Sequence, residues 1–346
     1  MKLGAQLAIE TQAAQMKAIG FSVELAPFDD EAKPAIGISN ARKVVNDEDI
    51  LLLIGHLNSG VAIPASEVYR QADLAMISPA NTNPGITDRR LPNVNRVVGR
   101  DDVQGTAAAH FAKRHLRADT AYVVHDQTPY GKSGAEFFRT TAEQLGIRIL
   151  GFEGTIEKRN FERLIREVKA ASPHVLYFGG IYDKAAYFFR QAYYSGISAK
   201  LVGPDGMDSP DLVKIAGKAV VGLYYTTAVG PVSVLPMAKE FAERYRKRFG
   251  REPEPYAAEA FDATLVGLQA VRAAIDDSPA RQPTRSSVSR AVRRVKAFRG
   301  ITGIVEFDDK GDRRAAPYFV VEVVSERPED WGRNRFVMHL ELSPPL

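Results

Sequence analysis

The chain has 346 residues, 45% of them hydrophobic and 25% charged, and its 46 basic and 42 acidic side chains give a formal net charge of +4. This length predicts two compact domains, and the small basic excess favours no nucleic-acid partner. The absence of cysteine excludes disulfides, thiolate catalysis and cysteine-based metal sites, and the apolar runs are too short to span a membrane.

The first third of the chain alternates helices and strands. Residues 2–18 predict an amphipathic helix that ends near Gly20, and residues 21–28 alternate apolar and polar side chains as a strand does. The following elements are expected in this order: a helix over 34–46, a strand over 50–54, a helix over 62–71, and strands over 74–77 and 93–99. This alternation is typical of a doubly wound parallel sheet.

The same alternation begins again after a helix over residues 106–116. The expected elements are a strand over 120–125, a helix that ends at 145, a strand over 148–152, a helix over 161–170, and strands over 175–178, 200–202 and 222–227. Helices over 237–249, 256–275 and 288–295 and strands over 303–307 and 318–324 complete the chain. The predicted fold class is therefore α/β, with two doubly wound parallel-sheet lobes.

A basic helix near the carboxyl end carries arginines that resemble a nucleic-acid face. Because the same helix alternates with valines and no aromatic platform accompanies it, we interpret the arginines as a solvated helix surface. They are Arg285, Arg290, Arg293, Arg294 and Arg299.

Polar residues follow the predicted strands at the edge where an open α/β sheet binds ligands. Ser59, Thr82 and the amide of Ala80 suit a carboxylate, because several neutral donors can hold it together. Asp205 suits an ammonium group, and Tyr130 suits the apolar body of a ligand. Taken singly, each hydroxyl also fits a helix cap, Asp205 a turn and Tyr130 simple packing.

Enzyme signatures are absent from the sequence. No serine stands in a Gly-x-Ser-x-Gly elbow, and neither a P-loop nor a Gly-x-Gly-x-x-Gly follows a strand. His56 and His125 lie near strand ends without a second ligand at metal spacing, so both are interpreted as structural. We expect no catalytic residue, cofactor or metal, and a hydrolase or transferase remains a less favoured alternative.

Several motifs, in their order along the chain, resemble the leucine/isoleucine/valine-binding proteins, the periplasmic receptors of branched-chain amino acid ABC transporters. The resemblance covers residues 1–324. The motifs are Lys43-Val-Val-Asn, Ile54-Gly-His-Leu-Asn-Ser, Ser78-Pro-Ala-Asn-Thr, Gly99-Arg-Asp-Asp-Val-Gln-Gly, His125-Asp126 with Tyr130-Gly131, Tyr177-Phe-Gly-Gly, Gly203-Pro-Asp-Gly and Phe307-Asp-Asp-Lys-Gly-Asp.

The resemblance implies two lobes joined by three crossovers, which close on a ligand as a hinge does. The first lobe then comprises residues 1–100 and 228–306, the second comprises 101–227 and 307–325, and 326–346 form a peripheral tail. The resemblance further implies a periplasmic protein that captures an amino acid and delivers it to an inner-membrane ABC permease.

The family's binding roles transfer to this chain residue by residue. The loops at Ser59 and at Ala80 and Thr82 correspond to those that hold the ligand carboxylate. Asp205 corresponds to the acid that holds the ammonium, and Tyr130 lines the cleft. After Gly179-Gly180, where an aromatic residue is expected, Ile181 stands before Tyr182, and Tyr182 is taken as the ligand-facing residue with Ile181 as the alternative.

Two departures from the family carry consequences. Asp205 is one methylene shorter than the glutamate of the branched-chain receptors, so the ammonium sits deeper or is met through water. Family members also begin with a strand before the helix that here starts at Met1, which leads to the hypothesis that a signal peptide and a first strand lie upstream. A cytoplasmic amide or amino-acid sensor of the same fold is the alternative that needs no signal peptide.

Overall fold

The computed structural model describes residues 1–230 and 237–342, and its internal contacts divide the chain into two compact units. Unit 1 comprises Met1–Gly99 and Val229–Ala316, and unit 2 comprises Arg100–Ala228 and Pro317–Pro345. The polypeptide passes between the units after Gly99, after Ala228 and after Ala316. The last passage follows Ala316 instead of the predicted 306, because contacts with unit 1 hold residues 307–316: Asp312 pairs with Arg96, and Arg313 donates to the carbonyl of Val97. Strand β10 (Gly303–Val305) pairs antiparallel with β9 (Phe298–Gly300) in the same unit.

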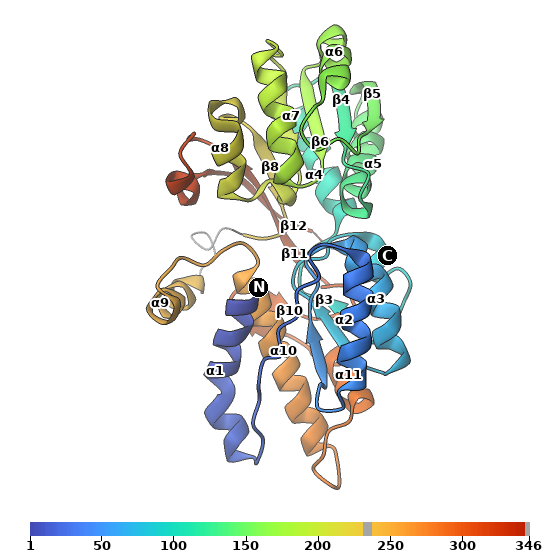
Figure 1. Cartoon of the computed structure of the whole chain (residues 1–346), viewed down its shortest axis with the longest axis vertical. Coiled ribbons are helices and arrows are strands. Elements are labelled where there is room, and N and C mark those ends of the chain that lie inside the picture. Colours follow the sequence, from blue (N-terminus) through green and yellow to red (C-terminus); the bar gives the residue numbers. More distant parts are fainter. Residues whose placement is uncertain (231–236, 343–346) are drawn as a thin grey trace. The chain divides into compact units, whose positions relative to one another are not determined.

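Unit 1 is built around a parallel sheet with the order β1-β2-β3 in its described part. Its strands are β1 (Leu52–Ile54), β2 (Ala75–Ser78) and β3 (Val94–Arg96), and its helices are α1 (Lys2–Ala18), α2 (Pro34–Asn46), α3 (Ser59–Gln71), α9 (Ala238–Phe249), α10 (Ala257–Asp276) and α11 (Arg285–Arg293). Figure 1 shows α2 and α3 beside this sheet, with α1 and α10 packed along each other.

The two faces of this sheet bury alternate residues of β2, as a pleated strand requires. Ala75 and Ile77 pack with apolar side chains of α10 and α11, whereas Met76 packs with side chains of α2 and α3. Both faces of the central strand are therefore covered, which explains why its sequence is continuously apolar.

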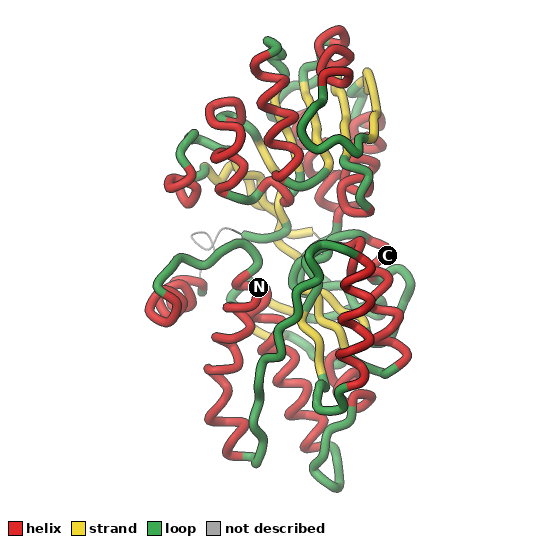
Figure 2. Tube along the Cα trace, viewed as in Figure 1, coloured by secondary structure: helices red, strands yellow, loops and turns green. Residues whose placement is uncertain are grey.

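Residues 21–28, predicted as a strand, form no strand in the structure. The segment runs from α1 to α2 as an extended loop (Figure 2). Its side chains alternate as predicted, with Phe21, Val23 and Leu25 half-buried and Ser22 and Glu24 exposed. Alternation fixes which side faces the core, but a strand also needs a neighbouring strand to bond with, and this segment has none among the described residues.

Unit 2 is built around a seven-stranded sheet, counted over the described residues, with the order β12-β11-β8-β7-β6-β4-β5. The strands from β5 to β8 are parallel and β11 is antiparallel to β8. The strands are β4 (Thr120–His125), β5 (Arg148–Gly154), β6 (Val175–Gly179), β7 (Lys200–Gly203), β8 (Tyr224–Thr227), β11 (Ala316–Glu322) and β12 (Arg335–Leu342).

Helices cover both faces of this sheet as well (Figure 1). One core joins α4 and α5 to alternate residues of β4, β6 and β7, including Val123 and Tyr177, and Phe178 instead contacts Phe188 and Phe189 of α7. The helices of unit 2 are α4 (Asp101–Arg114), α5 (Pro129–Gln144), α6 (Glu162–Ala171), α7 (Tyr182–Tyr194) and α8 (Pro210–Ala216). Two doubly wound parallel sheets confirm the predicted α/β class.

The segment predicted to be a peripheral tail adds strand β12 at the end of the seven-stranded sheet, next to β11. Trp331, in the turn before β12, donates from its indole Nε1 to Asp208 Oδ1 at 2.9 Å and stacks on Tyr225. The proline and several of the charged residues that suggested a peripheral tail lie in the turn Pro328–Arg333 before β12. Strand β12 itself stands at the edge of the sheet, where charged residues are tolerated.

The arginines of α11 are only partly the solvated surface that the sequence predicts. Arg293 donates to Asn95 Oδ1 at 2.6 Å and to the carbonyl of Val94 at 2.7 Å, and burial lowers its pKa. Arg285 donates to the carbonyls of Val45 and Ile50. These two side chains hold unit 1 together, while Arg290 and Arg294 are exposed.

In the described part of the chain, none of the helices combines the length and the apolar character that a membrane crossing demands.

Candidate functional site

Two loops of unit 1 follow adjacent parallel strands and lie against each other. The loop after β1 leads to Ser59, the first residue of α3, and the loop after β2 contains Ala80 and Thr82. The backbone N–H of Asn83 donates to Ser59 Oγ at 3.4 Å, so the structure brings Ser59 to the second loop. Ser59 is 2% exposed and Thr82 is 1% exposed. The predicted meeting of these two strand ends is thereby observed.

The hydroxyl and amide groups of these loops differ in the hydrogen bonds that they make. Within the described residues, the Thr82 hydroxyl makes no hydrogen bond. The amide of Ala80 makes a long hydrogen bond of 3.3 Å to Ser78 Oγ, whereas the amide of Asn81 reaches the same oxygen at 2.8 Å. Ser78 Oγ thus accepts from both amides, and the bond from the Ala80 amide is the weaker of the two. A ligand carboxylate can replace Ser78 Oγ as the acceptor of that amide.

Asn81 and Arg96 hold the two loops in place through hydrogen bonds, and neither was predicted as a site residue from the sequence. Asn81 Oδ1 accepts from the His56 amide at 3.2 Å, and Asn81 Nδ2 donates to the carbonyl of Leu57 at 2.9 Å. Arg96 is fully buried, and its Nη1 donates to the carbonyls of Asn81 and Asn83, both at 2.9 Å. Its Nε meets Asp312 Oδ1 at 2.5 Å. Asn81 and Asp312 stand in motifs of the sequence, but their contacts with Arg96 join distant parts of the chain and form only in the fold.

In unit 2, Tyr130 and Asp205 are joined directly. Tyr130 is the second residue of α5, whose first turn is capped by Thr128 Oγ1 accepting from the Gly131 amide at 3.0 Å. Its hydroxyl donates to Asp205 Oδ1 and accepts from the amide of Gly206 at 2.6 Å. Asp205 follows β7 and is 2% exposed. The two residues that the sequence singled out in this lobe therefore form one hydrogen-bonded unit.

Gln104 and Tyr177 complete this acidic region and were not predicted as site residues. Gln104 Nε2 donates to Asp205 Oδ1 at 3.1 Å, across 101 residues of sequence. Burial, followed by the charges of Asp101 and Asp205, raises the pKa of Tyr177 well above its ordinary value. Tyr130 and Gln104 are both neutral donors, so they orient the Asp205 carboxylate without cancelling its charge.

Tyr182 and Ile181 stand together at the start of α7, with Ile181 as the residue before the helix and Tyr182 as its first residue. Both side chains are half-buried. Neither exposure nor position separates the two, so the assignment of Tyr182 to the ligand stays a prediction.

The two histidines near strand ends have structural partners. His56 Nδ1 lies 2.8 Å from Asp30 Oδ2, and its Nε2 lies 3.0 Å from the Tyr69 hydroxyl. The hydrogen bond from His56 lowers the pKa of Asp30. His125 Nδ1 accepts from the Gln127 amide at 3.2 Å, and burial lowers the pKa of His125. Among the described residues, no group of three or more acidic or histidine side chains is placed to hold a metal ion.

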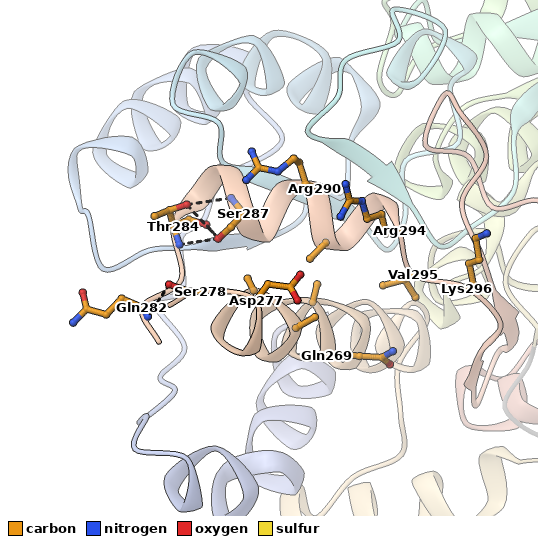
Figure 3. A pocket seen from close by; sticks show the side chains of 14 residues that line it. Gln269, Asp277, Ser278, Gln282, Thr284, Ser287, Arg290, Arg294, Val295 and Lys296 are labelled. Atoms are coloured by element: carbon orange, nitrogen blue, oxygen red, sulfur yellow. Dashed lines mark hydrogen bonds between the residues drawn. The ribbon is translucent and has the colours of Figure 1, made fainter. Parts of the chain in front are cut away.

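A separate pocket of about 420 Å³ lies between α10 and α11 of unit 1, far along the chain from the strand-end loops. Figure 3 shows Arg290, Arg294 and Lys296 at its rim, with Gln269 and Asp277 on the α10 side. None of the six predicted site residues lines it. Of these cations Arg290 belongs to α11, and we assign no ligand to the pocket.

Comparison with known proteins supports one family for nearly the whole chain. The model of a family described as periplasmic binding protein matches residues 1–328. The chain is 33% identical over 337 residues to a Leu/Ile/Val-binding protein homolog 2 of Brucella abortus, covering 97% of this chain and 88% of that protein. It is 29% identical to a leucine-, isoleucine-, valine-, threonine- and alanine-binding protein of Pseudomonas aeruginosa, covering 93% and 84%.

Solved structures share the fold. The leucine binding protein LivK of Thermotoga maritima superposes with a TM-score of 0.87 at 28% identity, covering 98% of this chain and 92% of that one. The substrate binding protein LivJ of Streptococcus pneumoniae, solved in complex with isoleucine, superposes with a TM-score of 0.85 at 22% identity, covering 99% and 94%. The second likeness concerns the fold alone.

Proposed function

The chain belongs to the periplasmic binding protein family, and we propose that it is a solute-binding protein that captures a branched-chain or related amino acid for an ABC importer. Relatives over most of the chain carry names of leucine-, isoleucine- and valine-binding proteins. An enzyme is not proposed, because the matched proteins are named as binding proteins.

In this proposal the ligand is held at its two charged ends. Ser59, Thr82 and the amide of Ala80 supply neutral donors to the α-carboxylate, and Asp205 receives the α-ammonium. The observation that supports the second role is the buried Asp205 carboxylate, which Tyr130 and Gln104 orient through hydrogen bonds to Oδ1. Tyr182 contributes apolar contact to the side chain of the ligand.

The buried Asp205 carboxylate favours a cationic group on the ligand. Burying a carboxylate costs free energy, which positive charge and hydrogen bonds offset. An α-ammonium adds both beside Asp205, so we expect an amino acid to gain more from this site than the corresponding simple carboxylic acid. The proposal therefore favours amino acids over aliphatic or aromatic acids.

Membership of the family also supports a proposal about the protein that receives the ligand and about where this chain is located. We propose a membrane permease of the ABC class as the partner that receives the ligand, and a periplasmic or extracellular location for the protein.

A thermal-shift screen with the twenty amino acids, their amides and aromatic acids tests the function. A ligand that binds only the folded chain stabilises it by about 2.7 kcal/mol at a concentration of 100 times the dissociation constant. We expect leucine, isoleucine or valine to give the largest rise in melting temperature, and the ligand to be recovered unchanged after incubation. A response confined to amides or aromatic acids, or conversion of the ligand, would contradict the proposal.

A further inference from the structure

The loop after β7 carries Asp205, the proposed partner of the ligand ammonium, on one turn of 3₁₀ helix, Asp205–Met207. Two backbone hydrogen bonds close this turn: the Met207 amide donates to the Pro204 carbonyl at 3.0 Å, and the Asp208 amide donates to the Asp205 carbonyl at 2.9 Å. A single methylene separates an aspartate carboxylate from its backbone, so the position of the Asp205 carboxylate follows the turn closely. Contacts that fix Asp208 therefore also fix Asp205.

Two aromatic side chains hold the end of this turn at Asp208. Trp331 donates from its indole Nε1 to Asp208 Oδ1 at 2.9 Å, and the hydroxyl of Tyr225 on β8 donates to the same oxygen at 3.2 Å. The two rings stack, with centroids 6.2 Å apart and an angle of 8° between their planes. Burial raises the pKa of Asp208, and the hydrogen bonds from Trp331 and Tyr225 oppose that shift, so they favour the ionised carboxylate.

Trp331 is itself held in place from the carboxyl-terminal part of the chain. It lies in the turn Pro328–Arg333, which leads into β12 and is drawn in red beside α8 in Figure 1. The neighbouring Asp330 is 8% exposed, and it accepts from Arg327 Nε at 2.8 Å and lies 3.1 Å from Arg333 Nη1. These contacts stabilise the backbone that carries the indole.

We infer, on the basis of the proposed function, that Trp331 is a positioning residue for the amino-acid site: by holding Asp208 it sets the position of the Asp205 carboxylate and thereby the affinity for the ligand ammonium. Tyr130 holds the start of the same turn through Asp205 and Gly206. All of these residues belong to unit 2. With both ends of the turn held, the carboxylate does not have to be ordered when the ligand binds, which is the free-energy advantage of a preorganised site.

A purely structural role of Trp331 leads to a different expectation. If Trp331 only packed the turn before β12 onto the sheet, its loss would lower the stability of unit 2 and affect all ligands alike. If it positions Asp205, its loss weakens a ligand that has an ammonium group and spares a ligand that lacks one.

Trp331→Phe keeps an aromatic ring next to Tyr225 and removes the donor to Asp208. The full chain and this variant are titrated by calorimetry with leucine and with 4-methylpentanoic acid, which lacks the ammonium group. Because a hydrogen bond to a charged group is lost, we expect Trp331→Phe to bind leucine about 5-fold or more weakly and to bind 4-methylpentanoic acid within about 2-fold of the original chain.

Phe336→Leu is the matched control, because Phe336 lies on β12, is 40% exposed and contacts Phe319 instead of the Asp205 turn. We expect it to leave both affinities unchanged. Amide hydrogen exchange over residues 205–209 measures the order of the turn without ligand, and we expect it to be about 10-fold faster in Trp331→Phe and unchanged in the control.

Circular dichroism checks that the variants fold. If Trp331→Phe does not fold, Tyr225→Phe takes its place, since it removes the other side-chain donor to Asp208 and keeps the ring. We expect Tyr225→Phe to weaken leucine more than 4-methylpentanoic acid as well.

Titration of the original chain shows whether the function itself holds. If the original chain binds no branched-chain amino acid, the proposed function is wrong, and the positioning role with it. If it binds leucine but Trp331→Phe binds leucine as tightly, or weakens both ligands by the same factor, the function stands and Trp331 is not a positioning residue. Unchanged exchange over residues 205–209 in Trp331→Phe would equally overturn the positioning role.

Discussion

The hydroxyl of Tyr130 stands between Asp205 and the backbone of Gly206, donating to the carboxylate and accepting from the amide at 2.6 Å. One side chain therefore fixes both the position of the acid and the turn that carries it. Because the tyrosine acts as donor and acceptor at once, its hydroxyl and its ring have separable effects.

Replacing Tyr130 with phenylalanine keeps the ring and removes both hydrogen bonds. A hydrogen bond to a charged group contributes roughly 1.5–3 kcal/mol, so we expect leucine affinity to fall by about 10-fold or more. Isothermal titration calorimetry measures this. Tyr194→Phe is the matched control, since Tyr194 is 65% exposed in the same unit, and equal affinities of the two variants would contradict the assigned role.

Replacing Asp205 with alanine removes the proposed partner of the ligand ammonium. Loss of one member of a buried charge pair costs about 2–5 kcal/mol, so we expect leucine binding to weaken by at least about 30-fold. The control is Asp211→Ala, whose carboxylate lies on the surface of α8 near Lys214. An Asp205→Ala variant that folds and binds leucine as the original chain does would remove the basis of the ammonium site.

Because both contacts act on the same carboxylate, the two changes should not be additive. We expect the double variant of Tyr130→Phe and Asp205→Ala to bind leucine no more weakly than Asp205→Ala alone. Additive losses, measured in the same titrations, would mean that Tyr130 contributes to binding independently of the acid.

Arg96 is the structural counterpart in unit 1, since it joins the loop at Asn81 to Asp312. Arg96→Met removes the cation beside the buried Asp312 carboxylate and the donor to the carbonyls of Asn81 and Asn83, which should cost about 3–5 kcal/mol of unfolding free energy. Denaturant unfolding measures it, with Arg294→Met as the exposed control. Similar midpoints for both variants would show that this buried pair does not support the loop.

We expect the buried Glu259 to make the stability of the folded chain depend on pH. Its side chain is fully enclosed, and burial, with Asp262 adding to the effect, raises its pKa to about 8. The folded chain then holds a proton that the unfolded chain releases above its ordinary pKa of 4.5, so stability declines as the pH rises from 4.5 to 8. Glu259→Gln cannot ionise, and we expect its melting temperature to exceed that of the original chain at pH 8 and to flatten this pH profile. If the melting temperature of Glu259→Gln fell with pH as steeply as that of the original chain, Glu259 would not be the source of the pH dependence.

The sequence predicted correctly those helices and strands whose own residues show a clear apolar pattern. The parallel strands β4 and β6 and the long helix α10 follow from apolar runs and helical spacing. The strand predicted over residues 21–28 is not formed, because alternation does not reveal whether a neighbouring strand is present. Strand β12 was not predicted, because an edge strand tolerates polar residues that weaken its pattern. The basic helix was misread at Arg293, whose partners Asn95 and Val94 lie almost 200 positions away, at separations of 198 and 199.

The candidate site divides in the same way. Ser59, Thr82 and Asp205 lie just beyond strand ends, where general rules for open sheets place ligands, so the sequence pattern alone singles them out. Gln104 lies within a helix and reaches Asp205 across 101 residues, and Arg96 lies within a strand and reaches Asp312 across 216. Long-range partners of this kind follow from the fold, which no local pattern encodes.

We propose that the protein holds one amino acid by its carboxylate and its ammonium together. Calorimetric titration with leucine, 4-methylpentanoic acid and 3-methylbutylamine separates the two contacts, because the two analogues keep the apolar side chain and each lacks one charged group. We expect leucine to bind, and each analogue to bind at least about 30-fold more weakly. Binding of 4-methylpentanoic acid as tightly as leucine would contradict it.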